Sequence, residues 1–136
     1  MRVNTHISFN GDCEAAFRFY AACLDARIEI MLTYGESPMA GQFPADWQGK
    51  IIHAGLAIGN DSISGADAWP ADPGPPKGFT MSLSFNDTVE TERVFNALSE
   101  GGKITLPLQK TFWTSHYGML TDRFGIPWMI NYNPSA

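Results

Sequence analysis

Three histidines are the residues of this sequence with the widest chemical range: His6, His53 and His116. Imidazole binds divalent metals and transfers protons near neutral pH, so each histidine is a candidate ligand or general base. No two of them are close in sequence, and the chain contains neither an H-x-x-x-H nor a C-x-x-C pattern. A metal site would therefore have to be assembled from distant segments.

The two cysteines, Cys13 and Cys23, fall within one predicted helix. Ten residues of helix span about 15 Å, whereas a disulfide needs its Cα atoms within about 7 Å. The two thiols therefore cannot pair within the chain. Reduced, partly buried thiols are typical of a cytoplasmic protein, and we expect that location here.

An internal repeat supplies the elements that must position these side chains. Ser8-Phe9-Asn10 recurs as Ser84-Phe85-Asn86, and each copy leads into an acidic residue that can cap a helix. Asp12 should open the first helix, and Asp87 with Glu90 predicts a capping box for the second. Each helix shows a 3.6-residue apolar stripe, Cys13-Phe17-Tyr20-Leu24 in the first and Thr91-Val94-Phe95-Leu98 in the second.

Three strands are predicted to follow each helix. Apolar residues alternate over 28–34 and 104–108. A second pattern is repeated at the start of the next strand of each half, as His53-Ala54-Gly55 and His116-Tyr117-Gly118. The predicted fold is α+β, one domain over 1–136 made of two βαβββ modules at about 1–66 and 78–136. A proline-rich linker, 67–77, joins them, and an irregular insertion at about 35–50 occurs only in the first half.

The chain is identified by resemblance as a member of the vicinal oxygen chelate superfamily, in its PhnB-like branch. This superfamily includes glyoxalase I, bleomycin-resistance proteins and extradiol dioxygenases. The segments that carry the resemblance cover nearly the whole chain; they are 7–11, Phe19-Tyr20, 64–67, 77–80, 111–113, Tyr117-Gly118 and 121–130. The run Thr121-Asp122-Arg123-Phe124-Gly125-Ile126-Pro127-Trp128-Met129-Ile130 is the most specific of them.

The resemblance implies a curved mixed sheet around a cleft, and commonly a homodimer. In metal-dependent members of the superfamily, two histidines and one or two glutamates from four strands bind a divalent metal. Counting back from the helices, the histidine positions fall on Asn4 and Thr80. The glutamate positions fall near Ser64 and on Met129. These four side chains are poor ligands for such an ion, so we expect neither a metal nor another cofactor.

Strand alternation predicts which other side chains face the cleft. Ile7 and Phe9 should pack on the first helix, which leaves Asn4, His6 and Ser8 on the other face. A register error of two residues would replace Asn4 by His6. The residues expected to line the cleft are Asn4, His6, Ser64, Asp67, Thr80, Ser82, Trp113, Tyr117 and Met129. Asp67 has the wrong parity for this face unless its strand contains a bulge.

The catalytic residues, if any, stay unknown, with His6 and His116 as candidates. Near Trp113 and Tyr117, His116 could act as a base or a hydrogen-bond donor to a substrate. The alternative is that His53 and His116 are equivalent strand-end histidines that bond backbone groups. The repeated glycine two residues beyond each of them favours this alternative.

Composition excludes several classes of partner. The apolar fraction of 44% is too high for a disordered chain, and no apolar run reaches the roughly 18 residues of a membrane span. A net charge of −5 argues against binding nucleic acid or anionic lipid.

The predicted function is metal-free binding of a small apolar or aromatic ligand. Aromatic side chains with a few polar groups are the usual lining of small-molecule sites. Trp47, in the 35–50 insertion, is expected either to cover the ligand or to form a dimer contact. One alternative is a lyase, isomerase or dioxygenase with a rearranged metal site of His6, Asp67 and perhaps His116. Another is a bleomycin-resistance-type protein that sequesters a drug.

Overall fold

The protein is described by a computed structural model that covers residues 1–71, 74 and 76–136. The chain divides into two compact units, Met1–Pro73 and Gly74–Ala136. Unit 1 contains β1 (Thr5–Phe9), α1 (Cys13–Leu24), β2 (Arg27–Thr33), β3 (Ile51–Ile58) and β4 (Asp61–Asp67). Unit 2 contains β5 (Met81–Phe85), α2 (Thr88–Ser99), β6 (Lys103–Gln109), β7 (Tyr117–Thr121) and β8 (Pro127–Tyr132).

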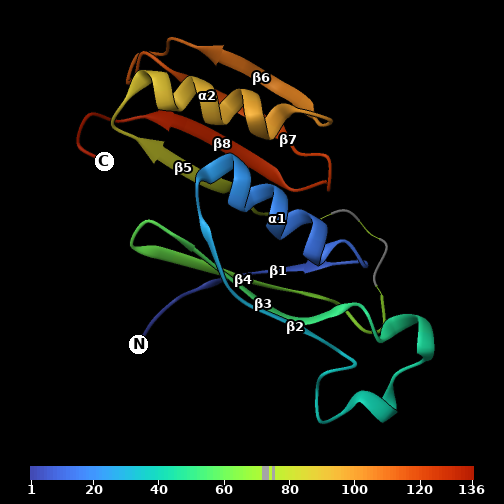
Figure 1. The fold of residues 1–136 in the computed structure, drawn as a ribbon. Coiled ribbons are helices and arrows are strands. Elements are labelled where there is room, and N and C mark those ends of the chain that lie inside the picture. Colours follow the sequence, from blue (N-terminus) through green and yellow to red (C-terminus); the bar gives the residue numbers. More distant parts are fainter. Residues whose placement is uncertain (72–73, 75) are drawn as a thin grey trace. The chain divides into compact units, whose positions relative to one another are not determined.

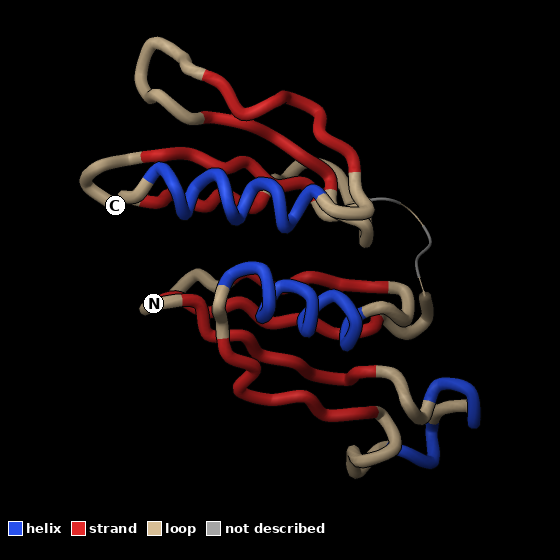
Figure 2. Tube along the Cα trace, turned by 45° about the horizontal axis from the view of Figure 1, so that its top comes forward, coloured by secondary structure: helices blue, strands red, loops and turns tan. Residues whose placement is uncertain are grey.

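Each unit is a four-stranded mixed sheet with one helix on one face (Figures 1 and 2). The strand order is β1-β4-β3-β2 in unit 1 and β5-β8-β7-β6 in unit 2. In both units the first and last strands pair in parallel, and the other neighbours pair antiparallel. This confirms the predicted α+β class and the repeated βαβββ order.

The apolar stripe of each helix forms the core of its unit. Phe17 and Tyr20 of α1 are fully buried, and Phe17 contacts Phe9 of β1 with ring centroids 6.2 Å apart. In α2 the buried residues are the four predicted from the sequence, Thr91, Val94, Phe95 and Leu98. Burial of these apolar side chains is the main favourable term that holds each helix on its sheet.

Glycine lets the sheet approach each helix closely. A Cβ atom on Gly65 of β4 would lie 2.7 Å from the Phe17 ring, and one on Gly118 of β7 would lie 2.7 Å from the Phe95 ring. Real Cβ atoms essentially never come this close to other heavy atoms. The Phe17 and Phe95 rings therefore occupy the space that the side chain of any residue other than glycine would need at positions 65 and 118.

The two helix N-termini are capped differently. Asp87 accepts a hydrogen bond from Glu90 N at 2.9 Å, as predicted, but the Glu90 carboxylate pairs with Arg93 and does not complete the capping box. Asp12 occupies the predicted N-cap position of α1, yet its side chain makes no cap hydrogen bond. Asp67 supplies that bond from the end of β4, because its Oδ1 accepts from Cys13 N at 3.0 Å.

The 35–50 insertion forms a small lobe beyond the ends of β2 and β3 (Figures 1 and 2). It contains two 3₁₀ helices, Ala40–Gln42 and Ala45–Trp47. Trp47 packs on Tyr34 and Trp69, with centroids 6.1 and 5.2 Å away, and Phe43 also contacts Tyr34 and Trp69. The lobe is therefore held to unit 1 by an aromatic cluster.

The predicted linker 67–77 begins with the last residue of β4, and its residues 72, 73 and 75 lie outside the described part of the chain. Over the described ranges, no helix is long and apolar enough to cross a membrane.

Candidate functional site

The face of the unit 1 sheet opposite α1 carries three of the side chains predicted for the site, Asn4, His6 and Ser64. Ile7 and Phe9 are buried against the helix, and His6 and Ser8 lie on the opposite, open face. The strand register aligns His6 with Ser64, and Ser64 in turn with Gly55. The sheet thus brings together His6, which strand parity placed on this face, and Ser64, which the resemblance placed in the cleft.

A pocket of about 190 Å³ opens on this face. Its lining combines an amide, a carboxylate, an imidazole and two hydroxyl groups with apolar surface. The lining residues are Asn4, Glu29, Ile30, His53, Gly55, Ser62, Ile63 and Ser64. This chemistry suits hydrogen bonding to a polar ligand, whereas the sequence predicted a largely apolar one.

His6 extends the hydrogen-bonding system of the pocket. Its Nδ1 lies 2.9 Å from Ser64 Oγ, and Ser64 lines the pocket. The pair can exchange donor and acceptor roles, because the hydroxyl rotates and the imidazole has two tautomers. A ligand that bonds to Ser64 would therefore also affect the hydrogen bond between Ser64 and His6.

A bulge in β2 places Glu29 at the pocket. The pairing of β2 with β3 shifts between Ile28 and Ile30, which leaves Glu29 as an extra residue in the ladder. Ile30 consequently pairs with Gly55 and joins the pocket lining. Arg27 lies 3.3 Å from the Glu29 carboxylate, and both side chains are largely exposed, so the ion pair is weak.

The open face of unit 2 has a more apolar composition. Trp128 and Ile130 of β8 are buried on the α2 side, so Met129 and Asn131 lie on the other face. Ser82 pairs with Met129, which pairs with Met119. Ser84 pairs with Asn131, which pairs with Tyr117. Predicted residues Ser82, Tyr117 and Met129 thus share this face, and Thr80 directly precedes β5.

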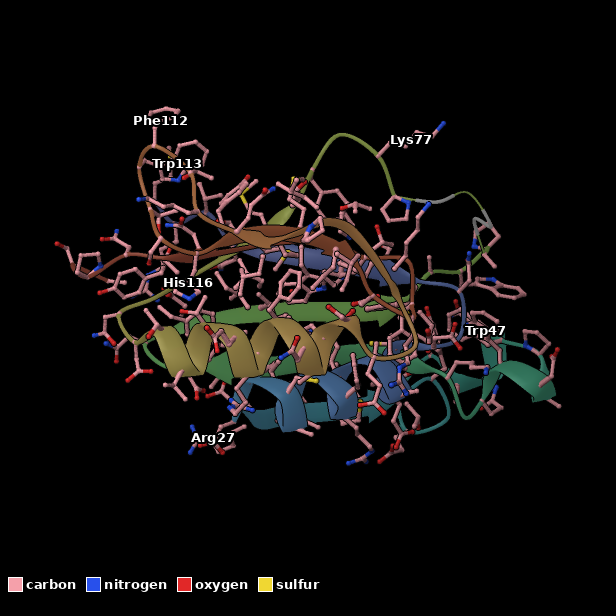
Figure 3. All side chains as sticks on the ribbon, turned by 90° about the horizontal axis from the view of Figure 1, so that it is seen from above. Arg27, Trp47, Lys77, Phe112, Trp113 and His116 are labelled. Carbon is pink, nitrogen blue, oxygen red and sulfur yellow. The ribbon has the colours of Figure 1, made fainter. Side chains whose placement is uncertain are left out.

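Trp113 borders this face on the loop between β6 and β7. Its ring centroid is 5.1 Å from that of Tyr117 and 4.7 Å from that of Phe112. Phe112 is 96% exposed and Trp113 is 53% exposed, and both stand on the loop (Figure 3). The structure therefore brings the predicted pair Trp113 and Tyr117 together.

Asp67 does not belong to the open face, which corrects its prediction as a cleft residue. It is 1% exposed and lies on the α1 side of the sheet. Its Oδ1 accepts from Gly11 N and Cys13 N, and its Oδ2 accepts from Ile51 N. The carboxylate is thus committed to the backbone, and it cannot share a metal site with His6 on the opposite face.

His116 also lies away from the open face of its sheet, contrary to its assignment beside Trp113 and Tyr117. Its Nε2 is 3.0 Å from a carboxylate oxygen of Glu92 in α2, and its Nδ1 is 2.7 Å from Ser115 Oγ (Figure 3 shows its position). His116 therefore connects the start of β7 to the helix.

His53 and His116 are not structurally equivalent, because the repeated sequence pattern is offset by one residue from the structural repeat. Ser64 of unit 1 corresponds to Met129 of unit 2. Ser64 pairs with Gly55 and Met129 pairs with Met119, so Gly55 corresponds to Met119. His53 lies two residues before Gly55, and Tyr117 lies two residues before Met119. His53 thus corresponds to Tyr117, and His53 is the histidine that lines a pocket.

The side chains at the superfamily's metal positions do not fit a divalent metal. By the resemblance, the histidine positions fall on Asn4 and Thr80, and the glutamate positions fall near Ser64 and on Met129. These are an amide, two hydroxyls and a thioether, which together form a weak donor set. Within residues 1–71, 74 and 76–136, no group of three or more His, Cys, Asp or Glu side chains is placed to hold a metal ion.

Sequence reasoning did not identify Glu29, Ser62, Asn131 or the pocket role of His53. Ser62 could have been found, because it shares the parity of Ser64. Glu29 depends on a bulge that regular alternation does not reveal. His53 was treated as the equivalent of His116. Aligning the two repeats by strand pairing matches His53 with Tyr117 instead.

Comparison with known proteins agrees with the observed fold. The family model described as "Glyoxalase/Bleomycin resistance protein/Dioxygenase superfamily" matches residues 3–130. Protein YjdN of Escherichia coli (strain K12) is 34% identical over 139 residues, covering 96% of this chain and 95% of that protein.

Two solved structures are similar over nearly the whole chain. The crystal structure of protein PA1353 from Pseudomonas aeruginosa has 42% identity and a TM-score of 0.88, with 98% of both chains covered. A putative 3-demethylubiquinone-9 3-methyltransferase, PhnB protein, from Bacillus cereus has 21% identity and a TM-score of 0.83, covering 98% of this chain and 100% of that one. At that identity, the second structure shows a shared fold.

Proposed function

Because the chain belongs to the glyoxalase/bleomycin resistance protein/dioxygenase superfamily, we propose that it binds a small molecule on the open faces of its sheets without the divalent metal of the metal-dependent members. The poor donor set of Asn4, Thr80, Ser64 and Met129 supports the metal-free part of this proposal. Binding, with or without turnover, then depends on hydrogen bonds and apolar contacts from the chain itself.

The observation that carries the proposal is the pocket of about 190 Å³ in unit 1. Glu29, His53 and Ser64 bring a carboxylate, an imidazole and a hydroxyl to one concave surface. A few polar groups placed around a cavity are typical of small-molecule sites. A ligand of this pocket is expected to be polar on the side that meets these groups. The open face of unit 2, with Tyr117 and Met129, favours apolar or aromatic molecules.

A pocket-filling substitution tests this proposal. Ser64→Leu places a larger apolar side chain in the pocket and removes the hydrogen bond to His6. We expect it to abolish the binding of fragments that contact the pocket in a ligand-observed NMR screen of the intact protein. Ser8→Leu is the matched control, because Ser8 shares the open face but does not line the pocket.

The proposal fails if, among a few hundred polar fragments, none binds the wild-type protein more tightly than it binds the Ser64→Leu variant. It also fails if Ser8→Leu and Ser64→Leu lose binding equally, since the pocket would then not be the site.

We also propose that the protein is a cytoplasmic homodimer. The reduced cysteines Cys13 and Cys23 support a reducing compartment, and the superfamily resemblance supports the dimer. The chain has a mass of 15.0 kDa, so light scattering after gel filtration should give about twice that value. A mass of one chain across micromolar concentrations would contradict the dimer.

Sequestration of a cationic drug is a second candidate function, favoured by the distribution of charge. Residues 1–73 contain nine acidic and four basic residues, so the whole net charge of −5 is in this part of the chain. Such a surface attracts cations over a distance set by ionic strength. Calorimetric titration with bleomycin should then show binding that weakens between 20 and about 200 mM salt. Absence of heat at low salt would dismiss this candidate.

A further inference from the structure

A hydroxyl and an imidazole lie side by side at the unit 1 pocket. Ser64 of β4 lines the pocket, and its Oγ is 2.9 Å from Nδ1 of His6 on the neighbouring strand β1. When the imidazole carries its proton on Nε2, its Nδ1 accepts a hydrogen bond from the Ser64 hydroxyl. A serine hydroxyl is a weak nucleophile that an adjacent base activates, and a hydrogen bond between the two groups is the structural sign of that activation.

The strand on the other side of Ser64 has no side chain at the paired position. β4 lies between β1 and β3, and Gly55 of β3 pairs with Ser64. Gly55 and Ile30 both line the pocket, and a Cβ atom on Gly55 would lie 3.1 Å from the Ile30 side chain. The base therefore flanks the Ser64 hydroxyl on one side, and on the other side the pocket surface over Gly55 is bounded by an apolar side chain.

Two further side chains of the pocket can stabilise the charge that a nucleophilic attack creates. The carbonyl oxygen of an ester becomes negative when a nucleophile adds, and hydrogen-bond donors around it lower the barrier. Asn4 offers an amide N–H and Ser62 a hydroxyl, and neither side chain makes a hydrogen bond within residues 1–71, 74 and 76–136. Ser62 lies two residues before Ser64 on the same face of β4, with about 7 Å between the Cα atoms, so its hydroxyl is within reach of that carbonyl oxygen.

The pocket favours a small substrate without negative charge. The Glu29 carboxylate is part of the lining, and the lining contains neither lysine nor arginine. A volume of about 190 Å³ suits a small acyl group, which Ile30 can contact. An anionic group in this pocket would meet the carboxylate without a compensating cation.

We propose that Ser64 and His6 form a nucleophile–base pair that hydrolyses an uncharged ester of a small carboxylic acid. The inference rests on the proposed function, because it assigns a reaction to the pocket that is proposed to bind a small molecule.

The reaction has two steps. In the first, Ser64 Oγ forms a bond to the acyl carbon, the bond from that carbon to the ester oxygen breaks, and the electron pair leaves with the ester oxygen. His6 takes the Ser64 proton and passes it to the leaving oxygen, which departs as an alcohol. In the second step, water attacks the acyl carbon and gives a proton to His6. The carboxylic acid is released as Ser64 regains a proton.

The expected reaction is slow, because no group orients the imidazole from its far side. Among the described residues, Ser64 is the hydrogen-bond partner of the His6 side chain, and no carboxylate is bonded to Nε2. In a complete catalytic triad, the carboxylate holds the imidazole in the productive tautomer. A stable covalent adduct is therefore a more sensitive readout than turnover.

An alkyl fluorophosphonate is the probe for this adduct, since a serine oxygen displaces its fluoride and the phosphonate ester that forms is stable. We expect the intact protein to gain one phosphonyl group, located at Ser64 by peptide mass spectrometry. Ser64→Ala should not be labelled. Ser8→Ala, the same change on the same face outside the pocket, should be labelled at the wild-type rate.

The role of His6 is tested by His6→Gln, which keeps a hydrogen-bond partner for Ser64 but removes the base. We expect it to lower the labelling rate by about a hundredfold. A purely structural role of His6 would be preserved by glutamine. Hydrolysis of p-nitrophenyl acetate should rank the variants in the same order, with Ser8→Ala equal to the wild type and Ser64→Ala the slowest.

Three results would overturn the inference. They are no label at Ser64 in the wild type, equal labelling rates for His6→Gln and the wild type, and hydrolysis of p-nitrophenyl acetate by Ser64→Ala as fast as by the wild type. Fragments that bind the wild type more tightly than Ser64→Leu, together with no label at Ser64, would overturn the reaction and leave the proposed binding function standing.

Discussion

Asp67 shows how one buried side chain can organise a whole unit. Its two oxygens accept hydrogen bonds from Gly11, Cys13 and Ile51, which stand before α1, at its first residue and at the start of β3. Tyr34 also donates its hydroxyl to the Asp67 carbonyl oxygen at 2.6 Å. A residue considered for ligand binding is therefore the junction of helix, strands and insertion lobe.

Removing that carboxylate should destabilise the protein strongly. Asp67→Ala leaves three backbone N–H groups without their acceptor, and we expect the free energy of unfolding to fall by about 3 kcal/mol. Asp12→Ala, at the nominal N-cap, should cost less than about 0.5 kcal/mol because Asp12 makes no cap bond. Urea denaturation of both variants measures the difference. Similar losses would contradict the role given to Asp67.

Cys13 should be inert as a thiol near neutral pH. Burial, with smaller contributions from the charges of Asp67 and Glu14, raises the pKa of Cys13 to about 12. The thiolate is the reactive form, so iodoacetamide at pH 8 should label Cys13 only after unfolding. Peptide mass spectrometry identifies the labelled site. Rapid labelling of Cys13 in the folded protein would contradict the buried position.

The same thiol contributes to the pH dependence of stability. An unfolded cysteine loses its proton at a pKa of about 8.5, and folded Cys13 keeps its proton to about 12. Stability is therefore fully present below the unfolded pKa and decreases as the pH rises from there toward 12. Cys13→Ala should flatten this decrease in a series of urea titrations between pH 8 and 11. An unchanged slope would show that other groups cause it.

At the scale of elements, the close approach of helix and sheet makes Gly118 a sensitive position. Gly118→Ala places a methyl group 2.7 Å from the Phe95 ring, with the backbone of β6 only slightly farther away. We expect a loss of about 1–3 kcal/mol from overpacking. Gly49→Ala is the control, because a Cβ there has no heavy atom within 4 Å. Thermal unfolding measures both variants.

The elements themselves were predictable because their signals are local. The helices follow from their apolar stripes and acidic N-termini, and the strands from alternation between turns. The bulge at Glu29 is a local break in pairing, and it turned Ile30 toward the pocket. The alternation of apolar and polar residues in one strand does not show how that strand pairs with its neighbour. For this reason neither the bulge nor the correspondence of His53 with Tyr117 was predicted.

At the scale of the whole molecule, part of the candidate site followed from counting. His6 was placed on the open face by strand parity and Ser64 by the resemblance, and the structure holds the two within hydrogen-bond distance. Trp113 was grouped with Tyr117 because the two are close in sequence, and their rings are in contact. Asp67 and His116 were misplaced because their hydrogen-bond partners lie far away in sequence, at Cys13 and Glu92. Long-range partners of this kind are set by tertiary packing, which a single sequence does not state.

The donor set at the superfamily's metal positions leads to a prediction for the intact protein. Purified protein should contain well below one equivalent of zinc, nickel, iron or manganese by elemental analysis. Dialysis against EDTA should leave the midpoint of thermal unfolding unchanged, because a bound metal would stabilise the folded state by mass action. Stoichiometric metal, or a midpoint lowered by EDTA, would contradict the proposed function.

The placement of tryptophan gives each unit its own optical reporter. Trp47 and Trp69 lie 5.2 Å apart in unit 1, close enough for their excited states to couple and give a paired circular dichroism band. Trp128 of unit 2 is fully buried and donates its indole N–H to Asp122, so its fluorescence should shift to the red when that unit opens. Recording both signals in one denaturation experiment would reveal whether the two halves of this repeat melt as one cooperative body or in succession.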